Sequence, residues 1–229
     1  MRKKTRELVQ FVRQELAKIA DPEKSAPMQR YMRSEIPFLG INKPERVKVV
    51  RRIKKCFPPE DRRGWEEAVL ALWKLPHREE RYVALDYLAL GKQFHDPESL
   101  TLMKRLIREG AWWDFVDFVA SQVLSPTLLN YRAEVAPVME QWIDDEDMWV
   151  RRAALLSQLK HKDAMDERQL FDHCLRRSGE KEFFIRKAIG WALRDYSWTR
   201  PESVRRFLEA HGEKLSPLSR REGGKRLGG

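Results

Sequence analysis

Apolar side chains recur every three to four residues along almost the whole chain, which is the period of an amphipathic α-helix. In residues 5–20, the first such segment, they are Leu8, Phe11, Val12, Leu16 and Ile19. The strict alternation of apolar and polar residues that marks a half-buried strand is not sustained anywhere. Prolines fall mainly between the helical segments, where they do not interrupt a helix. The pattern predicts an all-α protein.

The expected helices differ in length and are separated by short breaks. They cover residues 5–20, 28–36, 43–57, 66–74, 78–90, 97–108, 112–124, 135–143, 147–161, 167–176, 182–196, 201–210 and 219–227. Pro22 is well suited to the first position of a helix. Residues 126–131, which begin with a proline, are expected to form a connecting turn.

Two of these helices share an order of residue types at a separation of 35 positions. Residues 149–156 and 184–191 both begin with an aromatic residue, an aliphatic residue, two basic residues and alanine, and residues 81–86 are a weaker echo. A repeat of this length with paired helices is typical of HEAT-like proteins. We expect a HEAT-like α-solenoid of stacked antiparallel helix pairs. Such stacks curve, so basic positions at one repeat phase would form a basic stripe on a concave surface.

The expected domain organisation follows from the same pattern. We predict a single HEAT-like repeat domain over residues 1–229, with N-terminal helices in residues 5–60 and regular repeats in residues 61–227.

Charge and cysteine content restrict the partners. The chain has 45 Lys and Arg against 35 Asp and Glu, a net charge of +10, which favours a polyanion: nucleic acid first, an anionic membrane surface second. Apolar runs stay well short of the ~20 residues of a membrane span. Cys56 and Cys174 stand far apart and are interpreted as free thiols in a reducing compartment. We expect a cytoplasmic protein without metal or cofactor.

The candidate chemistry lies in residues 110–117. Trp113 and Asp117 are four residues apart, so a helix places them on one face. Alone, such residues are more often core aromatics and solvated acids. However, 35 residues after Asp117 comes Arg152, 35 further comes Lys187, and Trp191 follows one turn later. This recurrence favours a site.

Several segments together resemble the AlkD family, bacterial alkylpurine DNA glycosylases built from HEAT-like repeats. The segments are residues 27–32, 38–41, 112–117, 158–160, 182–191 and 217–219. The resemblance extends from about Phe11 to Arg226, and the motifs keep their order and spacing.

The resemblance implies an enzyme that excises cationic N3- and N7-alkylated purines from duplex DNA. It implies that Asp117 is the catalytic carboxylate and that Trp113 and Trp191 flank the lesion. It also implies that Arg152 contacts DNA and that Tyr31 lies near the lesion-bearing strand. We expect a monomer that works on the bacterial nucleoid during base excision repair.

The basic stripe supplies the remaining candidates. Arg151, Lys187 and Arg194 are predicted to help Arg152 hold the phosphates that flank the lesion. Taken one at a time, each is an ordinary solvated helix charge, so the prediction depends on their recurrence at one repeat phase.

Two other readings stay open. A basic HEAT-like array could bind damaged or branched DNA without catalysis, although pure binding requires neither Asp117 nor two facing tryptophans. A glycosylase-lyase could instead use Lys187 or another lysine as a Schiff-base nucleophile. A cationic base leaves as a neutral molecule, which makes a covalent route unnecessary. The sequence therefore favours a monofunctional, hydrolytic glycosylase.

Overall fold

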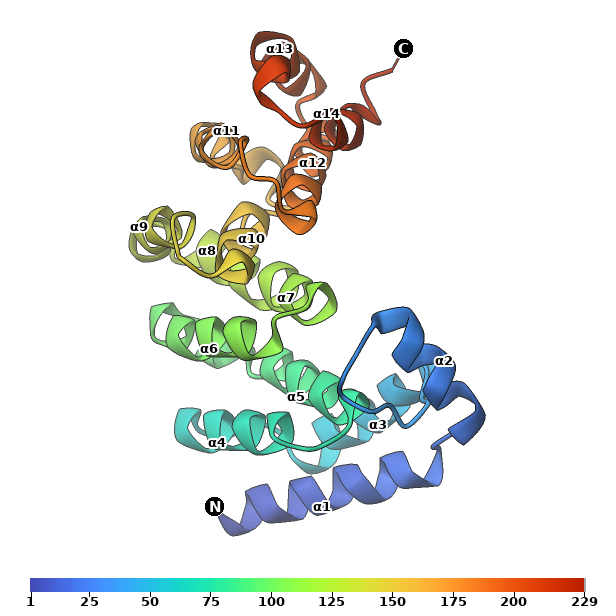
Figure 1. The fold of residues 1–229 in the computed structure, drawn as a ribbon. Helices are drawn as coiled ribbons and strands as arrows, with labels where there is room; N and C mark the ends of the chain where they lie inside the picture. The colour runs from blue at the N-terminus through green and yellow to red at the C-terminus, as the bar shows by residue number, and fades with distance from the viewer. Residues whose placement is uncertain (229) are drawn as a thin grey trace. The chain divides into compact units, whose positions relative to one another are not determined.

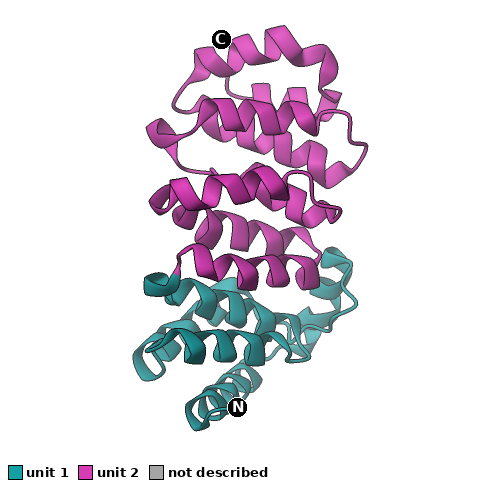
Figure 2. Ribbon diagram, turned by 90° about the vertical axis from the view of Figure 1, so that its left-hand side faces the viewer, with its two compact units in different colours: residues 1–94 teal, residues 95–229 magenta. Residues whose placement is uncertain are grey.

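The computed structural model describes residues 1–228, and its regular structure is helical throughout (Figure 1). No strand occurs among these residues, so the all-α prediction is confirmed. The chain divides into two compact units, residues 1–94 and residues 95–229 (Figure 2). Within residues 1–228, no helix is long and apolar enough to cross a membrane.

Unit 1 is built from five α-helices and a short 3₁₀ turn. They are α1 (Lys3–Lys18), α2 (Pro22–Met32), α3 (Lys43–Cys56), α4 (Arg62–Trp73), α5 (Arg78–Leu90) and the turn Lys92–Phe94. Helix α4 packs along α5, and α1 packs against α3, α4 and α5. Trp65 of α4 is fully buried in this core and donates a hydrogen bond from its indole N–H to the carbonyl oxygen of Tyr87.

The loop between α2 and α3 is held by a buried carboxylate. Glu79 of α5 accepts hydrogen bonds from the backbone N–H groups of Leu39, Gly40 and Ile41, at 2.8, 2.9 and 3.0 Å. Gly40 has a φ of 82°, and a Cβ there would lie 1.9 Å from the carbonyl oxygen of Asp21. The 38–41 motif therefore requires glycine at this position, where the loop lies against the start of α2 and accepts the N–H of Asp21 at Leu39.

Unit 2 contains the helices that carry the candidate site. They are α6 (Leu100–Gly110), α7 (Trp113–Val119), α8 (Ser125–Asn130), α9 (Arg132–Trp142), α10 (Met148–Leu156), α11 (Glu167–Arg176), α12 (Phe183–Ser197), α13 (Pro201–His211) and α14 (Pro217–Gly224). The short turns Pro97–Ser99, Lys162–Ala164 and Gly212–Lys214 connect some of them. Helix α7 packs on α10, α10 packs on α12, and α12 packs on α14. The helices related by the 35-residue repeat are therefore neighbours in space.

The repeat alignment predicts equivalent positions within this stack. Val150 and Ile185 are both fully buried, as are Ala153 and Ala188. Trp149 and Phe184, which the alignment equates, have ring centroids 4.9 Å apart. One surface of α10 thus packs against the equivalent region of α12.

The turn predicted at residues 126–131 is wrong. Helix α7 continues through a π-helical segment, Ala120–Leu124, directly into α8. Ser125 donates its N–H to the carbonyl oxygen of Ala120, five residues back, and Pro126 stands in the first turn of α8. The widened π-helical turn directly before Pro126 accommodates the proline ring and its missing N–H, so proline does not end the helix here.

The helix predicted at residues 28–36 begins earlier and ends earlier than expected. Asp21 caps α2 by accepting from the N–H groups of Glu23 and Lys24, so the helix begins at Pro22. The helix tolerates Pro27 in its interior and ends when Arg33 adopts a left-handed conformation, with a φ of 48°.

Candidate functional site

A pocket of about 290 Å³ in unit 2 brings most of the candidate residues together. Four neighbouring helices contribute its lining: α7, α10, α12 and α14. The lining residues are Trp113, Asp117, Arg152, Phe183, Phe184, Lys187, Trp191, Arg194 and Glu222. Successive helices of the stack contribute residues that are 35 positions apart, so residues far apart in the sequence meet in one cavity.

Asp117 forms a bidentate ion pair with Arg152. Arg152 donates from Nε to Oδ1 at 2.7 Å and from Nη2 to Oδ2 at 2.8 Å. Arg152 also donates from Nη1 to the carbonyl oxygen of Phe184, so its guanidinium connects α7, α10 and α12. The residue is 4% exposed. Arg152 thus fixes the orientation of the Asp117 carboxylate.

Burial and the ion pair shift the pKa of Asp117 in opposite directions. Desolvation raises the pKa of Asp117 above its usual value, and the hydrogen bonds and charge of Arg152 oppose that rise without cancelling it. The Asp117 side chain keeps 15% exposure in the pocket. A carboxylate oxygen has two lone pairs, so both oxygens can accept a further hydrogen bond despite Arg152.

Trp113 and Trp191 are half-buried and line the pocket from α7 and α12. Phe184 of the pocket lining also belongs to an aromatic cluster with Trp112 and Trp149, with ring centroids 4.9 to 6.0 Å apart. The guanidinium of Arg152 lies 5.8 Å from the ring centroid of Phe184. These packed rings restrict the movement of the Asp117–Arg152 pair.

Lys187 and Arg194 also line the pocket, and both bind one carboxylate that the sequence analysis did not identify. Glu222 of α14 accepts from Lys187 Nζ at 3.1 Å and from Arg194 Nη1 at 2.7 Å. Lys225 Nζ lies 2.7 Å from the same carboxylate. Hydrogen bonds from Lys225 and Lys187, opposed by burial, lower the pKa of Glu222 to about 2.

A sequence signal for Glu222 exists. Glu222 follows Lys187 by 35 positions, the interval that also relates Asp117 to Arg152 and Arg152 to Lys187. Extending the repeat by one step would have found it. Phe183 and Phe184 were also missed as site residues, because aromatic residues at a helix start are usually interpreted as packing.

Two predicted DNA contacts lie elsewhere. Arg151 is not a pocket residue: it donates to both carboxylate oxygens of Glu180, at 2.9 and 2.8 Å, and to the carbonyl oxygens of Asp145 and Glu146. Tyr31 belongs to α2 of unit 1 and is 81% exposed. The DNA contacts of these residues, and that of Arg152, stay predictions.

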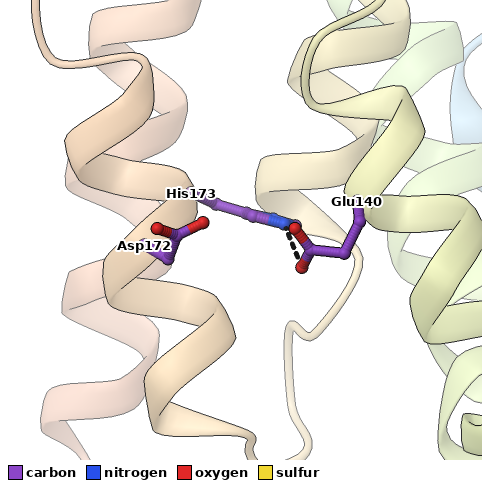
Figure 3. A group of neighbouring side chains, drawn as sticks. All are labelled: Glu140, Asp172 and His173. Atoms are coloured by element: carbon purple, nitrogen blue, oxygen red, sulfur yellow. Dashed lines mark hydrogen bonds and ion pairs between the residues drawn. The ribbon is translucent and has the colours of Figure 1, made fainter.

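A second charged cluster in unit 2 resembles a metal site in its residue types. His173 and Asp172 of α11 face Glu140 of α9, and His173 Nε2 lies 2.9 Å from Glu140 Oε1 (Figure 3). Arg176 Nη1, however, bonds Glu140 Oε2 at 2.7 Å and Asp172 Oδ2 at 3.1 Å. The guanidinium already supplies the positive charge that a cation would bring. We interpret the cluster as an ion-pair network joining α9 and α11.

Most of the chain is similar to known proteins, both in sequence and in structure. The sequence profile described as "DNA alkylation repair enzyme" matches residues 12–227. A solved structure described as a predicted DNA alkylation repair enzyme from Enterococcus faecalis is 31% identical, with a TM-score of 0.84, over 91% of this chain and 96% of that chain. No curated protein matches the chain.

Two more distant solved structures have the same fold. AlkD2 from Streptococcus mutans is 15% identical, with a TM-score of 0.63, over 82% of this chain and 92% of that chain. The protein smu.31 from Streptococcus mutans UA159 is 15% identical, with a TM-score of 0.62, over 78% and 91% of the two chains.

Proposed function

Because the chain belongs to the DNA alkylation repair enzyme family, we propose that it hydrolyses the N-glycosidic bond of cationic N3- or N7-alkylated purines in duplex DNA. One observation carries this proposal: Asp117, Trp113 and Trp191 line the same pocket, beside the cations of α12. A carboxylate that shares a pocket with two aromatic side chains suits a positively charged sugar or base.

The leaving group determines which catalytic groups are required. When the bond between C1′ and N9 breaks, the electron pair goes to the base and neutralises its positive charge. The base therefore leaves without protonation by a general acid. The sugar becomes electron-poor at C1′, and a water molecule adds there and loses a proton.

Asp117 is suited to both remaining tasks. As a carboxylate it stabilises positive charge at C1′, and a free lone pair accepts a hydrogen bond from the attacking water. Its raised pKa makes it a stronger proton acceptor than an ordinary aspartate. The bidentate contact with Arg152 holds the carboxylate in place before the substrate arrives.

Trp113 and Trp191 are suited to stabilise the same positive charge of the sugar and the base. Their π-faces attract the cationic base and the sugar C–H groups, and the attraction grows as charge builds on the sugar. Selectivity then comes from the charge of the lesion rather than from hydrogen bonds to its edge. Uncharged purines lack this attraction and remain poor substrates.

The DNA backbone is held by polar and cationic side chains around the reacting centre. Lys187 and Arg194 at the pocket, with Tyr31, Arg151 and Arg152, are the proposed DNA contacts. We propose that a monomer makes these contacts.

The test is excision from three defined duplexes, carrying 7-methylguanine, 3-methyladenine or an uncharged lesion. We expect release of the two cationic bases and abasic sites that break only after heat or alkali. Strand scission without alkali, or a borohydride-trapped adduct at Lys187, would indicate a lyase instead. Tight binding with no base release from any duplex would leave a non-catalytic DNA-binding protein.

A further inference from the structure

Glu222 is a buried carboxylate surrounded by accessible cations. The residue is 4% exposed, and Lys187, Arg194 and Lys225 bind its two oxygens. The three cationic side chains are themselves 40%, 30% and 48% exposed. The carboxylate is thus withdrawn from solvent, whereas the cations bound to it remain open to a second ligand.

Helix α14 is placed for this contact by two glycines. A Cβ on Gly190 of α12 would lie 2.4 Å from the Cβ of Glu222, and one on Gly223 would lie 3.2 Å from the Cβ of Leu193. Ser219, fully buried, donates its hydroxyl to the carbonyl oxygen of Arg186 at 2.9 Å. The close crossing of α12 and α14 therefore sets Glu222 between the cations.

Charge is unbalanced at this point. Three cations share one carboxylate, so positive charge is in excess beside the pocket. Ammonium and guanidinium groups that converge on two oxygens form the arrangement that binds a phosphate, whose non-bridging oxygens accept the same hydrogen bonds.

We propose that Lys187, Arg194 and Lys225 form a binding site for a DNA backbone phosphate, and that Glu222 takes the place of this phosphate in the free protein. The proposal rests on the proposed function in that duplex DNA is the substrate. A phosphate must compete with Glu222 for the three cations, so Glu222 weakens binding to any DNA backbone. Undamaged DNA, which offers phosphates but no cationic base, is then released more easily.

The test compares Glu222→Gln with Glu134→Gln on undamaged duplex. Both variants remove one negative charge, and Glu134 is an exposed residue of α9 outside the pocket. We expect Glu222→Gln to bind about tenfold more tightly, equivalent to about 1.4 kcal/mol, and Glu134→Gln to change affinity less than about twofold. The log–log salt slope of Glu222→Gln should become steeper by about 0.9 for each additional phosphate that the variant neutralises.

A double variant ties the tighter binding to the cations. In Glu222→Gln/Arg194→Gln, the added affinity and the added salt slope should both be lost. Unchanged or weaker binding by folded Glu222→Gln, or tighter binding that survives in the double variant, would overturn the proposal. Thermal melting establishes that each variant is folded.

A variant that keeps Glu222 covers the case in which Glu222→Gln does not fold. Lys225→Gln should bind undamaged duplex more weakly, with a slope smaller by about 0.9, and unaltered binding would overturn the proposal. Because binding to undamaged DNA requires no base release, this experiment is separate from the excision assay. If the wild type excises bases but Glu222→Gln binds undamaged duplex no more tightly, the phosphate site alone is refuted. If Glu222→Gln binds more tightly but the wild type releases no base, the glycosylase activity alone is refuted.

Discussion

The pocket has two sides that use the same repeat phase in different ways. On one side Asp117 and Arg152 form a one-to-one pair, and Arg152 is buried by neighbouring helices and aromatic rings. On the other side Glu222 is buried and shared among three cations that remain accessible. The order of charge along the repeat is acid, base, base, acid, at residues 117, 152, 187 and 222.

The difference shows that two buried carboxylates of one pocket can have different roles, depending on how many cations bind each of them. A balanced, buried pair fixes the direction of one carboxylate and leaves little net charge. An unbalanced cluster with exposed cations leaves charge for an external anion. We therefore expect the Asp117 side to control the rate of base release and the Glu222 side to control the affinity for the backbone.

The largest expected effect is that of Asp117→Asn on excision. Removing the negative charge opposite the electron-poor sugar should slow single-turnover release of 7-methylguanine by roughly 10²-fold or more. Affinity for the same duplex should hold or rise, because a charge that repels phosphates disappears. Near-normal excision by the folded variant would show that Asp117 has no role in the mechanism. The Asp117 side would then not control the rate of base release.

Stability must be measured on the same variant. Asparagine presents an NH₂ group toward the guanidinium of Arg152, which stays buried without its counter-charge, so a loss of roughly 3–5 kcal/mol in unfolding free energy is expected. Melting curves distinguish this loss from the loss of catalysis. Slower excision explained entirely by weaker binding or partial unfolding would make Asp117 a structural residue.

The acid limb of the pH–rate profile tests the same side without a mutation. Burial raises the pKa of Asp117. As the pH falls through this raised pKa, the carboxylate is protonated and the rate should fall about tenfold per pH unit. The midpoint should lie above 3.8, the ordinary value for aspartate. Single-turnover rates, corrected for acid-catalysed base loss in enzyme-free DNA, give the midpoint, and a rate independent of pH across this range would contradict the role of Asp117.

Arg152→Gln separates orientation of Asp117 from phosphate binding. Arg152 lowers the pKa of Asp117, so its loss should move the acid limb to higher pH and reduce the rate roughly tenfold. The proposed phosphate contact of Arg152 predicts a salt slope of binding that is smaller by about 0.9 in the variant. An unchanged slope would show that Arg152 orients Asp117 without holding a phosphate. Arg151→Gln, next in the chain but paired with Glu180, is the control and should leave the acid limb unchanged.

The sequence alone predicted the helical fold from the apolar spacing of three to four residues, and the convergence of several site residues from the 35-residue period. Asp117, Arg152 and Lys187 repeat at that interval, so stacking of successive helices brings them to one pocket. The direct contact between Asp117 and Arg152 could not be read from spacing, because opposite charges at one phase also fit two solvated side chains.

Other features depend on distances that a sequence pattern does not carry. The π-helical segment after Asp117 lets Pro126 sit inside a continuous helical stretch, whereas local rules favour a turn at proline. Glu222 lies in a segment that resembles a solvated basic tail, and only the close crossing at Gly190 brings it to Lys187. The concave DNA-binding face and the single-domain organisation stay predictions.

The smallest expected effect on the reaction is that of Gly190→Ala, which disturbs the Glu222 side without touching Asp117. The new methyl group would lie 2.4 Å from the Cβ of Glu222 and 3.1 Å from the carbonyl oxygen of Ser219, so α14 must move away from α12. Such overpacking costs typically about 1–3 kcal/mol of unfolding free energy. Gly179→Ala, where a Cβ meets nothing within 4 Å, is the matched control and should be close to neutral.

If the two sides act independently, the excision rate of Gly190→Ala at saturating enzyme should stay within about threefold of the wild type, because the Asp117–Arg152 pair is intact. Its affinity for undamaged duplex and its salt slope should change, because Glu222 no longer sits between Lys187 and Arg194. Melting curves, single-turnover rates and binding isotherms on one preparation measure all three quantities. A rate loss as large as that of Asp117→Asn in a folded Gly190→Ala protein would show that the two sides work as one unit, and the division of rate from affinity would then be wrong.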